Sequence, residues 1–306
     1  MPPVFFIFSK DDNSCRIAAI MRNSERTILA LLLNESSVMT KLRLVKLLFL
    51  LNRAGVENAY DFIPYKYGPF SFQLYRDLNK LSQDGWIDGE HLQLCHGKKT
   101  EAVIEIRKLP IEVRDKLLDI RSVYGRLSED ALLKTVYSKY PEFTFKSELK
   151  KTTAFIPKAP LSIYTIGYEG ASIDSFLNTL LQRGIARVID VRSNPVSRKW
   201  GFAKSTLAGL CQKTGIDYVH LPELGISSDK REGLATKDDY EALLDEYEKQ
   251  YLPTRKGKIQ DALSLVGKAP SALVCMEADV QMCHRGRLAN KMAKMIQLPI
   301  VHLTVK

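Results

Sequence analysis

The residues best suited to chemistry lie between positions 273 and 287, where an apolar segment is followed by a polar loop and then by a helical pattern. Cys275 and Glu277 stand where the expected strand ends, and Cys283, His284 and Arg285 stand where the expected helix begins. Open parallel sheets bind ligands outside the carboxyl ends of their strands, and helix N-termini attract anions. This segment therefore predicts a functional site at the end of a strand.

Other expected strands in the second half of the chain are also followed by polar residues. These residues come from three separate loops: Tyr168, Glu169 and Gly170; then Asp190, Arg192, Ser193 and Arg198; then His220 and Glu223. Because parallel strands direct their carboxyl ends to one edge of the sheet, we expect these groups to meet there.

Their chemical types suggest two roles. Carboxylates can activate water or stabilise the positive charge that builds on a sugar ring during glycosidic cleavage. We therefore assign as catalytic candidates Glu169, Asp190, Glu277, Cys283 and His284. Arginines hold phosphates and aromatic rings stack on bases, so the ligand-binding or phosphate-binding candidates are Tyr168, Gly170, Arg192, Ser193, Arg198 and Arg285.

Three alternatives stay open for these residues. Cys283 at a helix N-terminus beside Arg285 should have a lowered pKa and could be a nucleophile, whereas Cys275 is expected to be a small buried residue. No metal site and no cofactor are predicted, because the spacing matches no compact zinc pattern and the adjacent Cys283 and His284 should point in different directions. Asp190 and Arg192 could simply form an internal salt bridge.

The elements that position these residues are expected to form an α/β domain over residues 161–306. Apolar segments at 162–166, 186–191, 218–221, 271–276 and 299–305 alternate with helical patterns. Such alternation is typical of a Rossmann-like parallel sheet with helices on both faces.

The first part of the chain predicts a winged-helix-like α+β domain over residues 1–145, followed by a linker over 146–160. Three helical patterns precede a hairpin, of which residues 102–106 are expected to form the second strand. We expect this domain to bind DNA through basic residues, namely Lys41, Arg43, Lys46, Lys66, Arg76, Lys98 and Lys99.

Two family resemblances accompany these patterns. The segments 166–170, 189–195 and 220–225, with Val274 to Glu277 and Cys283 to Arg285, resemble the successive motifs of the domain of unknown function 488 family. The resemblance implies a Rossmann-like domain and no settled reaction. Residues 44–51, the Tyr67-Gly68-Pro69 turn and residues 137–141 resemble the winged-helix-like antitoxin family called Panacea.

Charge and composition limit the partners and the compartment. The net charge of +10 favours an acidic partner, nucleic acid first. Five widely spaced cysteines do not form a disulfide framework and suggest a reducing compartment. The apolar start of the chain is too short for a signal segment, and no apolar run approaches a membrane span. We expect a cytoplasmic protein that binds DNA and no membrane, with a homodimer or a protein partner through the N-terminal domain as a further expectation.

The sequence thus favours an enzyme, a hydrolase that processes DNA or a modified base or nucleotide, for example by N-glycosidic cleavage in DNA repair or phage defence. One alternative is a non-enzymatic DNA-binding regulator or defence sensor that binds a small anionic ligand. A second is an antitoxin-like protein-interaction module.

Overall fold

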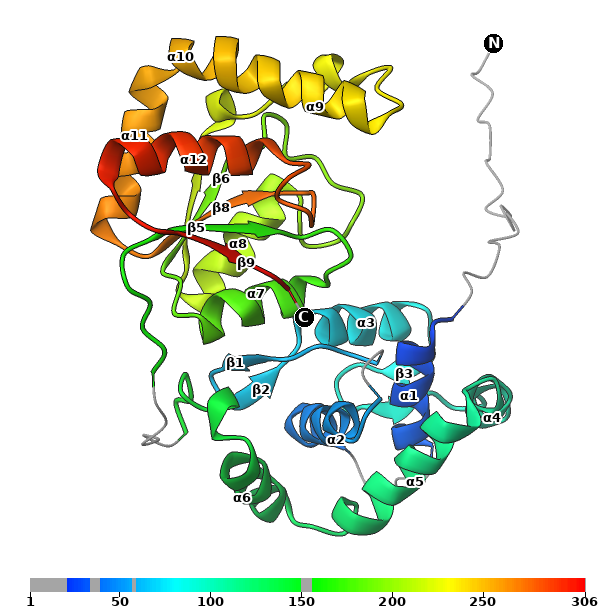
Figure 1. Ribbon diagram of the computed structural model, residues 1–306. Helices are drawn as coiled ribbons and strands as arrows, with labels where there is room; N and C mark the ends of the chain where they lie inside the picture. Colours follow the sequence, from blue (N-terminus) through cyan, green and yellow to red (C-terminus); the bar gives the residue numbers. More distant parts are fainter. Residues whose placement is uncertain (1–20, 34–38, 57–58, 150–155, 306) are drawn as a thin grey trace, which may run out of the picture.

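The chain folds into an N-terminal helical domain and a C-terminal α/β domain (Figure 1). The computed structural model describes residues 21–33, 39–56, 59–149 and 156–305. In the N-terminal domain the elements are α1 (Asn23–Leu32), α2 (Lys41–Arg53), β1 (Ile63–Tyr65), β2 (Gly68–Phe70), α3 (Phe72–Gln83), β3 (Ile87–Asp88), β4 (Gln93–Leu94), α4 (Lys99–Arg107), α5 (Ile111–Tyr124) and α6 (Glu129–Lys139).

Local signals in the sequence start two of these helices. The Thr40 hydroxyl accepts a hydrogen bond from the Arg43 backbone N–H, and the Ser71 hydroxyl accepts one from Leu74, so each caps the first turn of its helix, α2 or α3. The apolar face of α2 then forms the centre of the domain, where the ring of Phe49 packs edge-on against aromatic neighbours.

The hairpin after α3 differs from the expectation. The second strand of this wing is β4, paired antiparallel with β3, and residues 102–106 belong instead to helix α4. A five-residue alternation of apolar and polar residues is compatible with either structure. Here only Ala102 is buried, while Ile104 is about half exposed, which a strand packed on a core would not allow.

The C-terminal domain has a five-stranded sheet in the order β7-β6-β8-β5-β9, in which neighbouring strands run parallel. This confirms the expected α/β class. Its elements are β5 (Ile163–Gly167), α7 (Ile173–Gln182), β6 (Arg187–Asp190), α8 (Lys204–Thr214), β7 (Asp217–His220), α9 (Lys237–Glu246), a π-helical turn (Tyr247–Tyr251), α10 (Leu252–Thr254), α11 (Lys256–Lys268), β8 (Ser271–Cys275), α12 (His284–Ile296) and β9 (Ile300–Leu303).

Helices cover both faces of this sheet because its strands are apolar on both sides. On β5, Tyr164 and Ile166 pack with the residues of α7 and α8, whereas Ile163 packs with those of α11 and α12. Successive strand residues point to opposite faces, so one strand serves both apolar clusters. The central position of β8, between β6 and β5, brings the carboxyl ends of three strands to one edge.

The two domains are joined through α7, which lies between the sheet and the N-terminal domain (Figure 1). Asp174, in the first turn of α7, is fully buried and accepts hydrogen bonds of 2.8–2.9 Å from the backbone N–H groups of Phe72 and Gln73 and from the Ser71 hydroxyl. Burial raises the pKa of the Asp174 carboxyl, and these three hydrogen bonds oppose the rise. A carboxylate of one domain therefore satisfies the N-terminus of a helix in the other.

We expect the substitution Asp174→Ala to lower the free energy of unfolding by about 1–3 kcal/mol, because it leaves buried donors at the start of α3 without an acceptor. Urea unfolding followed by tryptophan fluorescence measures the change. Asp238→Ala is the matched control, since Asp238 stands at the equivalent position of α9 but is exposed. Equal effects of the two substitutions would contradict the proposed role of Asp174 as an interdomain cap.

Candidate functional site

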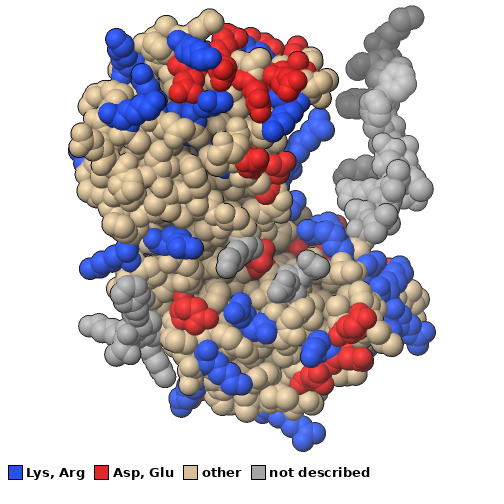
Figure 2. All heavy atoms as spheres, viewed as in Figure 1, with Lys and Arg blue, Asp and Glu red and all other residues tan. Residues whose placement is uncertain are grey.

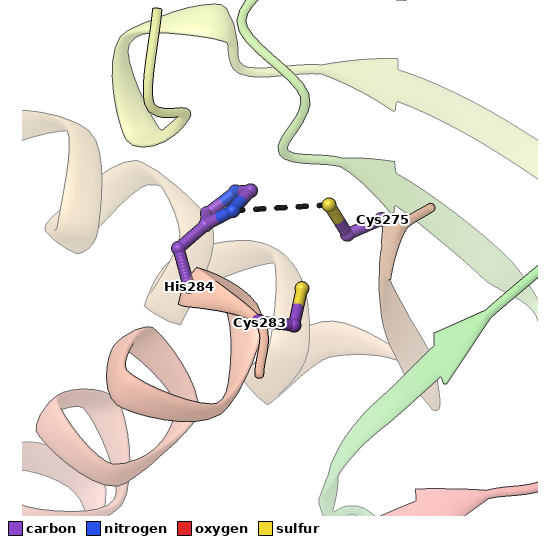
Figure 3. Close-up of side chains that lie close together, drawn as sticks. All are labelled: Cys275, Cys283 and His284. Atoms are coloured by element: carbon purple, nitrogen blue, oxygen red, sulfur yellow. Dashed lines mark hydrogen bonds between the residues drawn. The ribbon is translucent and has the colours of Figure 1, made fainter. Parts of the chain in front are cut away.

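Two cysteines and a histidine meet where β8 ends and α12 begins (Figure 3). Cys275 is the last residue of β8, Cys283 is the N-cap residue of α12, and His284 is its first helical residue. The Sγ atoms of the cysteines and a ring nitrogen of His284 all lie within 4.8 Å of one another. The expectation that Cys283 and His284 point apart is therefore wrong: the helix starts with an extended N-cap, which lets both side chains face Cys275.

Glu277 lies against both thiols. Its Oε2 atom accepts hydrogen bonds of 3.0 Å from the Sγ of Cys275 and from that of Cys283. Its other oxygen, Oε1, is 2.8 Å from Nη1 of Arg231, and Nη2 of the same guanidinium lies 3.4 Å from Nδ1 of His284. The site therefore consists of five interacting groups, which we call the Cys–His–Glu cluster: Cys275, Glu277, Cys283, His284 and Arg231.

The titration of these groups is coupled because they are buried together. The neighbouring Cys283 thiol and the His284 ring lower the pKa of Cys275 to about 5 against the effect of burial. Burial raises the pKa of Cys283 well above its usual range, and Cys275 raises it further. Burial acts to raise the pKa of Glu277, but the two thiols and Arg231 lower it to about 2.

The loop between β8 and α12 is fixed by backbone contacts. Arg285 is 2 % exposed and donates from its guanidinium to the carbonyl oxygens of Glu277 and Ala278. The backbone N–H groups of Tyr168 and Glu169 donate to the carbonyl of Met276. The guanidinium of Arg285, which the sequence predicted to hold a phosphate, instead donates its hydrogen bonds to the loop that carries Glu277 and fixes the conformation of that loop.

Gly167 permits this loop to lie against β5. A Cβ atom at Gly167 would meet the carbonyl oxygen of Glu277 at 1.9 Å, which is too close for any side chain. The strand end and the loop can approach only because position 167 carries a hydrogen.

Asp190 and Arg192 form a buried ion pair beside this cluster. Nε of Arg192 donates to Oδ1 of Asp190 over 2.8 Å, and the Tyr218 hydroxyl donates to Oδ2 over 2.6 Å. Nη1 of Arg192 also donates to the Tyr168 hydroxyl and to the Phe202 carbonyl. The internal salt bridge considered as an alternative is therefore present. Together with the hydrogen bonds to Tyr168 and Phe202, it uses most of the N–H donors of Arg192.

A pocket of about 200 Å³ opens at this edge of the sheet. Its lining includes two arginines and Cys275: Tyr168, Arg192, Ser193, Asn194, Val196, Ile226, Ser228, Arg231, Cys275 and Met276. The Cys–His–Glu cluster thus reaches the pocket through Cys275 and Arg231.

The other predicted site residues lie at the margin. Glu169 is exposed and accepts a hydrogen bond from the Ala278 backbone N–H over 3.0 Å. Gly170 has a φ of +74° and completes the turn after β5. Arg198 is exposed in the loop after β6 and is not among the residues that line the pocket. Asp190 faces Arg192 rather than Glu277.

Sequence reasoning missed Arg231 and Tyr218. Arg231 lies on a 3-10 turn (Asp229–Arg231) in the long segment between β7 and α9, where no strand end or motif marks it. The sequence pattern predicts Tyr218 only as part of a strand. The signal that could have identified it is the strand register: Tyr218 of β7 pairs with Val188 of β6, which lies on the same face of the sheet as Asp190 two residues further along.

The predicted DNA-binding residues do not form one surface. Lys46 has to be removed from that set, because it is 1 % exposed and donates to the carbonyls of Tyr67 and Pro69. Arg43 donates to the carbonyls of Gly125 and Leu127. Four others are exposed or half-buried at two places: Lys41 and Lys66 line one pocket together with Lys46, and Lys98 and Lys99 are adjacent at the start of α4. Two of them are paired, Lys66 with Glu148 and Lys98 with Glu101.

On the face that Figure 2 shows, basic and acidic side chains are mixed over both domains.

Arg76 differs from the other predicted DNA-binding residues, because it lies on a groove that residues of both domains line. Its guanidinium lies over the Trp200 ring, 5.2 Å from the centroid, and both residues line a groove of about 540 Å³ between α3 and the C-terminal domain. Lys80, Lys213 and Tyr75 line the same groove.

We expect Gly167→Ala to lower the free energy of unfolding by roughly 1–3 kcal/mol, because the new methyl group forces the Glu277 loop away from β5. Thermal unfolding measures the loss. Gly209→Ala is the control: a Cβ at this helical position meets no atom within 4 Å, and the protein should be unchanged or up to about 1 kcal/mol more stable. A neutral Gly167→Ala would show that the loop is loosely held.

Within the described part of the chain, no helix has both the length and the apolarity that a membrane crossing requires. No curated protein and no solved structure matches the chain. One family model matches, that of the domain of unknown function DUF488, over residues 172–292. The matched range begins at the N-cap of α7 and ends inside α12, so it contains the whole Cys–His–Glu cluster and every residue that lines the pocket except Tyr168. The C-terminal half of this chain is similar to the DUF488 family.

Proposed function

We propose that the protein is a hydrolase that acts on a base or nucleotide of nucleic acid at the pocket beside Cys275. The observation that carries the proposal is that Arg192 and Arg231, the Tyr168 ring and the buried Cys–His–Glu cluster border a single pocket. Arg231, whose side chain is partly exposed, attracts a phosphate, an aromatic edge contacts a base, and an adjacent carboxylate and thiol can take part in the reaction.

Glu277 is the group that we assign to charge stabilisation. Its carboxylate stays ionised at neutral pH, because the thiols and Arg231 lower its pKa to about 2. An ionised carboxylate stabilises the positive charge that develops on a sugar carbon when an N-glycosidic bond breaks.

Nucleic acid would be held by the groove between α3 and the C-terminal domain. Arg76 and Lys213 supply positive charge there, whereas Lys80 pairs with Glu25 and Asp84. Trp200 and Tyr75 supply flat rings on which bases can stack. A winged helix usually directs the start of its third helix towards a DNA groove. In this chain that end of α3 is buried against Asp174. We therefore infer that nucleic acid binds along the exposed side of α3.

A cytoplasmic location fits this proposal. Two of the free cysteines among the described residues belong to the Cys–His–Glu cluster, and a reducing compartment would keep these thiols reduced.

The test is to incubate the purified protein with duplex and single-stranded DNA carrying ordinary and modified bases, and to detect released bases and cleaved strands by mass spectrometry. We expect Glu277→Gln to reduce turnover by about 10²-fold or more, as loss of a catalytic carboxylate does. Asp279→Asn is the control, because Asp279 lies two residues further along the same loop and is exposed. Absence of product with every substrate would overturn the hydrolase and favour a sensor or a protein-interaction module.

We expect Arg76→Ala and Lys213→Ala to weaken nucleic-acid binding. Each substitution should also reduce the slope of log affinity against log salt by about one, because each removes a cation that neutralises one phosphate. Fluorescence anisotropy with a labelled oligonucleotide, repeated over a range of salt concentrations, measures the slope. Lys134→Ala is the control, because Lys134 is an exposed lysine on α6 that pairs with Asp130 away from the groove. An unchanged slope in the groove variants would rule out this route.

A further inference from the structure

The Cys–His–Glu cluster contains the donor types of a transition-metal site. Thiolate and imidazole groups prefer zinc among the common divalent ions, and two cysteines with one histidine form a known set of ligands for catalytic zinc. Cys275, Cys283 and His284 are all buried, at 1–2 % exposure. Three such side chains rarely converge in a protein core without a purpose, because burying polar groups costs free energy.

The His284 ring is oriented as a metal ligand requires. Its Nε2 atom lies 3.0 Å from the Val191 carbonyl oxygen, which can only accept a hydrogen bond, so Nε2 carries the proton. The lone pair of the neutral ring is then on Nδ1, and this atom faces Cys275. Ligating histidines are commonly fixed in this way by a backbone carbonyl on the second nitrogen.

The distance between Cys275 and His284 agrees with a tetrahedral ion, and Cys283 Sγ lies within 4.8 Å of both ligand atoms. Zinc binds sulfur at about 2.3 Å and nitrogen at about 2.1 Å, which separates a tetrahedral sulfur–nitrogen pair by about 3.6 Å. The Sγ of Cys275 and the Nδ1 of His284 are 3.7 Å apart (Figure 3). In that figure the three side chains point towards a common centre from the end of β8 and the start of α12.

The surrounding groups are compatible with such an ion. Glu277 lies 3.0 Å from both sulfur atoms, so its carboxylate would stand beside the ion, close to its fourth position. The ion would replace Arg231, now 3.4 Å away, as the partner of Nδ1 of His284, and Arg231 would keep its ion pair with Glu277 through Nη1. Arg285 already holds the loop that carries Glu277.

We propose that Cys275, Cys283 and His284 bind a zinc ion whose fourth position opens towards the pocket lined by Arg192 and Arg231. This site rests on the proposed hydrolase for its role and deepens it. Zinc bound there would lower the pKa of a water molecule at the fourth position towards neutrality, so that this water would lose a proton to solvent and attack a base or nucleotide in the pocket as hydroxide. Glu277, whose carboxylate lies beside both sulfur atoms, would accept a hydrogen bond from that water. Cys275 is then a ligand and not itself the nucleophile.

The test is metal binding by the whole protein, measured without reference to turnover. Protein purified with added zinc and then passed through a desalting column should contain about one zinc per chain by elemental mass spectrometry. Metal-free protein titrated with cobalt should show a sulfur-to-cobalt charge-transfer band and the strong visible bands of a tetrahedral ion. Wild-type protein that retains no zinc and shows no such bands would overturn the proposal.

Substitutions locate the ion. The double variant Cys275→Ser with Cys283→Ser should retain less than about a tenth of the zinc, since thiolates supply most of the affinity. Cys95→Ser is the control, because Cys95 lies in the N-terminal domain. Glu277→Gln should keep the cobalt bands, because Glu277 is not a ligand. Equal zinc in the double variant and in the control would overturn the site. Circular dichroism checks that each variant folds, and the wild-type cobalt spectrum needs no variant.

Failure of this site and failure of the hydrolase give different results. Zinc binding without any released product supports the metal site and overturns the hydrolase. Product formed equally well by metal-free protein supports the hydrolase and overturns a catalytic role for the ion. Loss of product on zinc removal, with recovery on zinc addition, supports both.

Discussion

The position of β8 in the centre of the sheet is the constraint on which the site depends. A strand with neighbours on both sides and helices on both faces must be apolar along its length, and residues 271–275 are fully buried. Polar chemistry can then begin only where the strand ends, at Cys275. Because β8 lies between β5 and β6, the loops after those strands meet the loop after β8, and Tyr168, Arg192 and Glu277 come together although they are far apart in the chain.

The start of a buried helix imposes a second constraint, which applies both at the site and at the junction between the domains. The first N–H groups of a helix have no partner within the helix, and a buried helix start is stable only when another group accepts from them. In α12 the N-cap residue belongs to the Cys–His–Glu cluster, so the beginning of that helix and the site are built together. In α3 the acceptor comes from α7 of the other domain. The N-terminal domain is therefore held by the sheet domain at the start of α3.

Sequence patterns predict the parts of this structure that depend on local order along the chain. The alternation of strands and helices after residue 160 is strong because each element needs its own apolar period, and it places Cys275, Glu277, Cys283 and His284 at the correct strand and helix ends. The assignment of residues 102–106 to a strand is wrong, because a short alternation of apolar and polar residues cannot distinguish a strand from a helix when the pairing partner is unknown.

Sequence patterns do not predict contacts between segments that are distant in the sequence. Lys46, for example, is expected on the surface. In the structure its ammonium group is buried and donates to the carbonyls of Tyr67 and Pro69 in the turn that covers it. Arg231 enters the site from a segment that no strand or long helix marks.

The charges of the cluster explain why it would bind an ion rather than remain a set of hydrogen bonds. Two thiols and a carboxylate can carry three negative charges, and the nearby cations are Arg231, Arg285 and, when protonated, His284. Burial of an unpaired charge is costly, so without an ion the second thiol stays protonated and its pKa is raised. A divalent ion changes this balance: two thiolates neutralise it, the histidine ring can be neutral, and Glu277 keeps Arg231 as its partner. Every charge in the cluster then has a counterpart, and the one coordination position that these side chains leave open is the one that the pocket can reach.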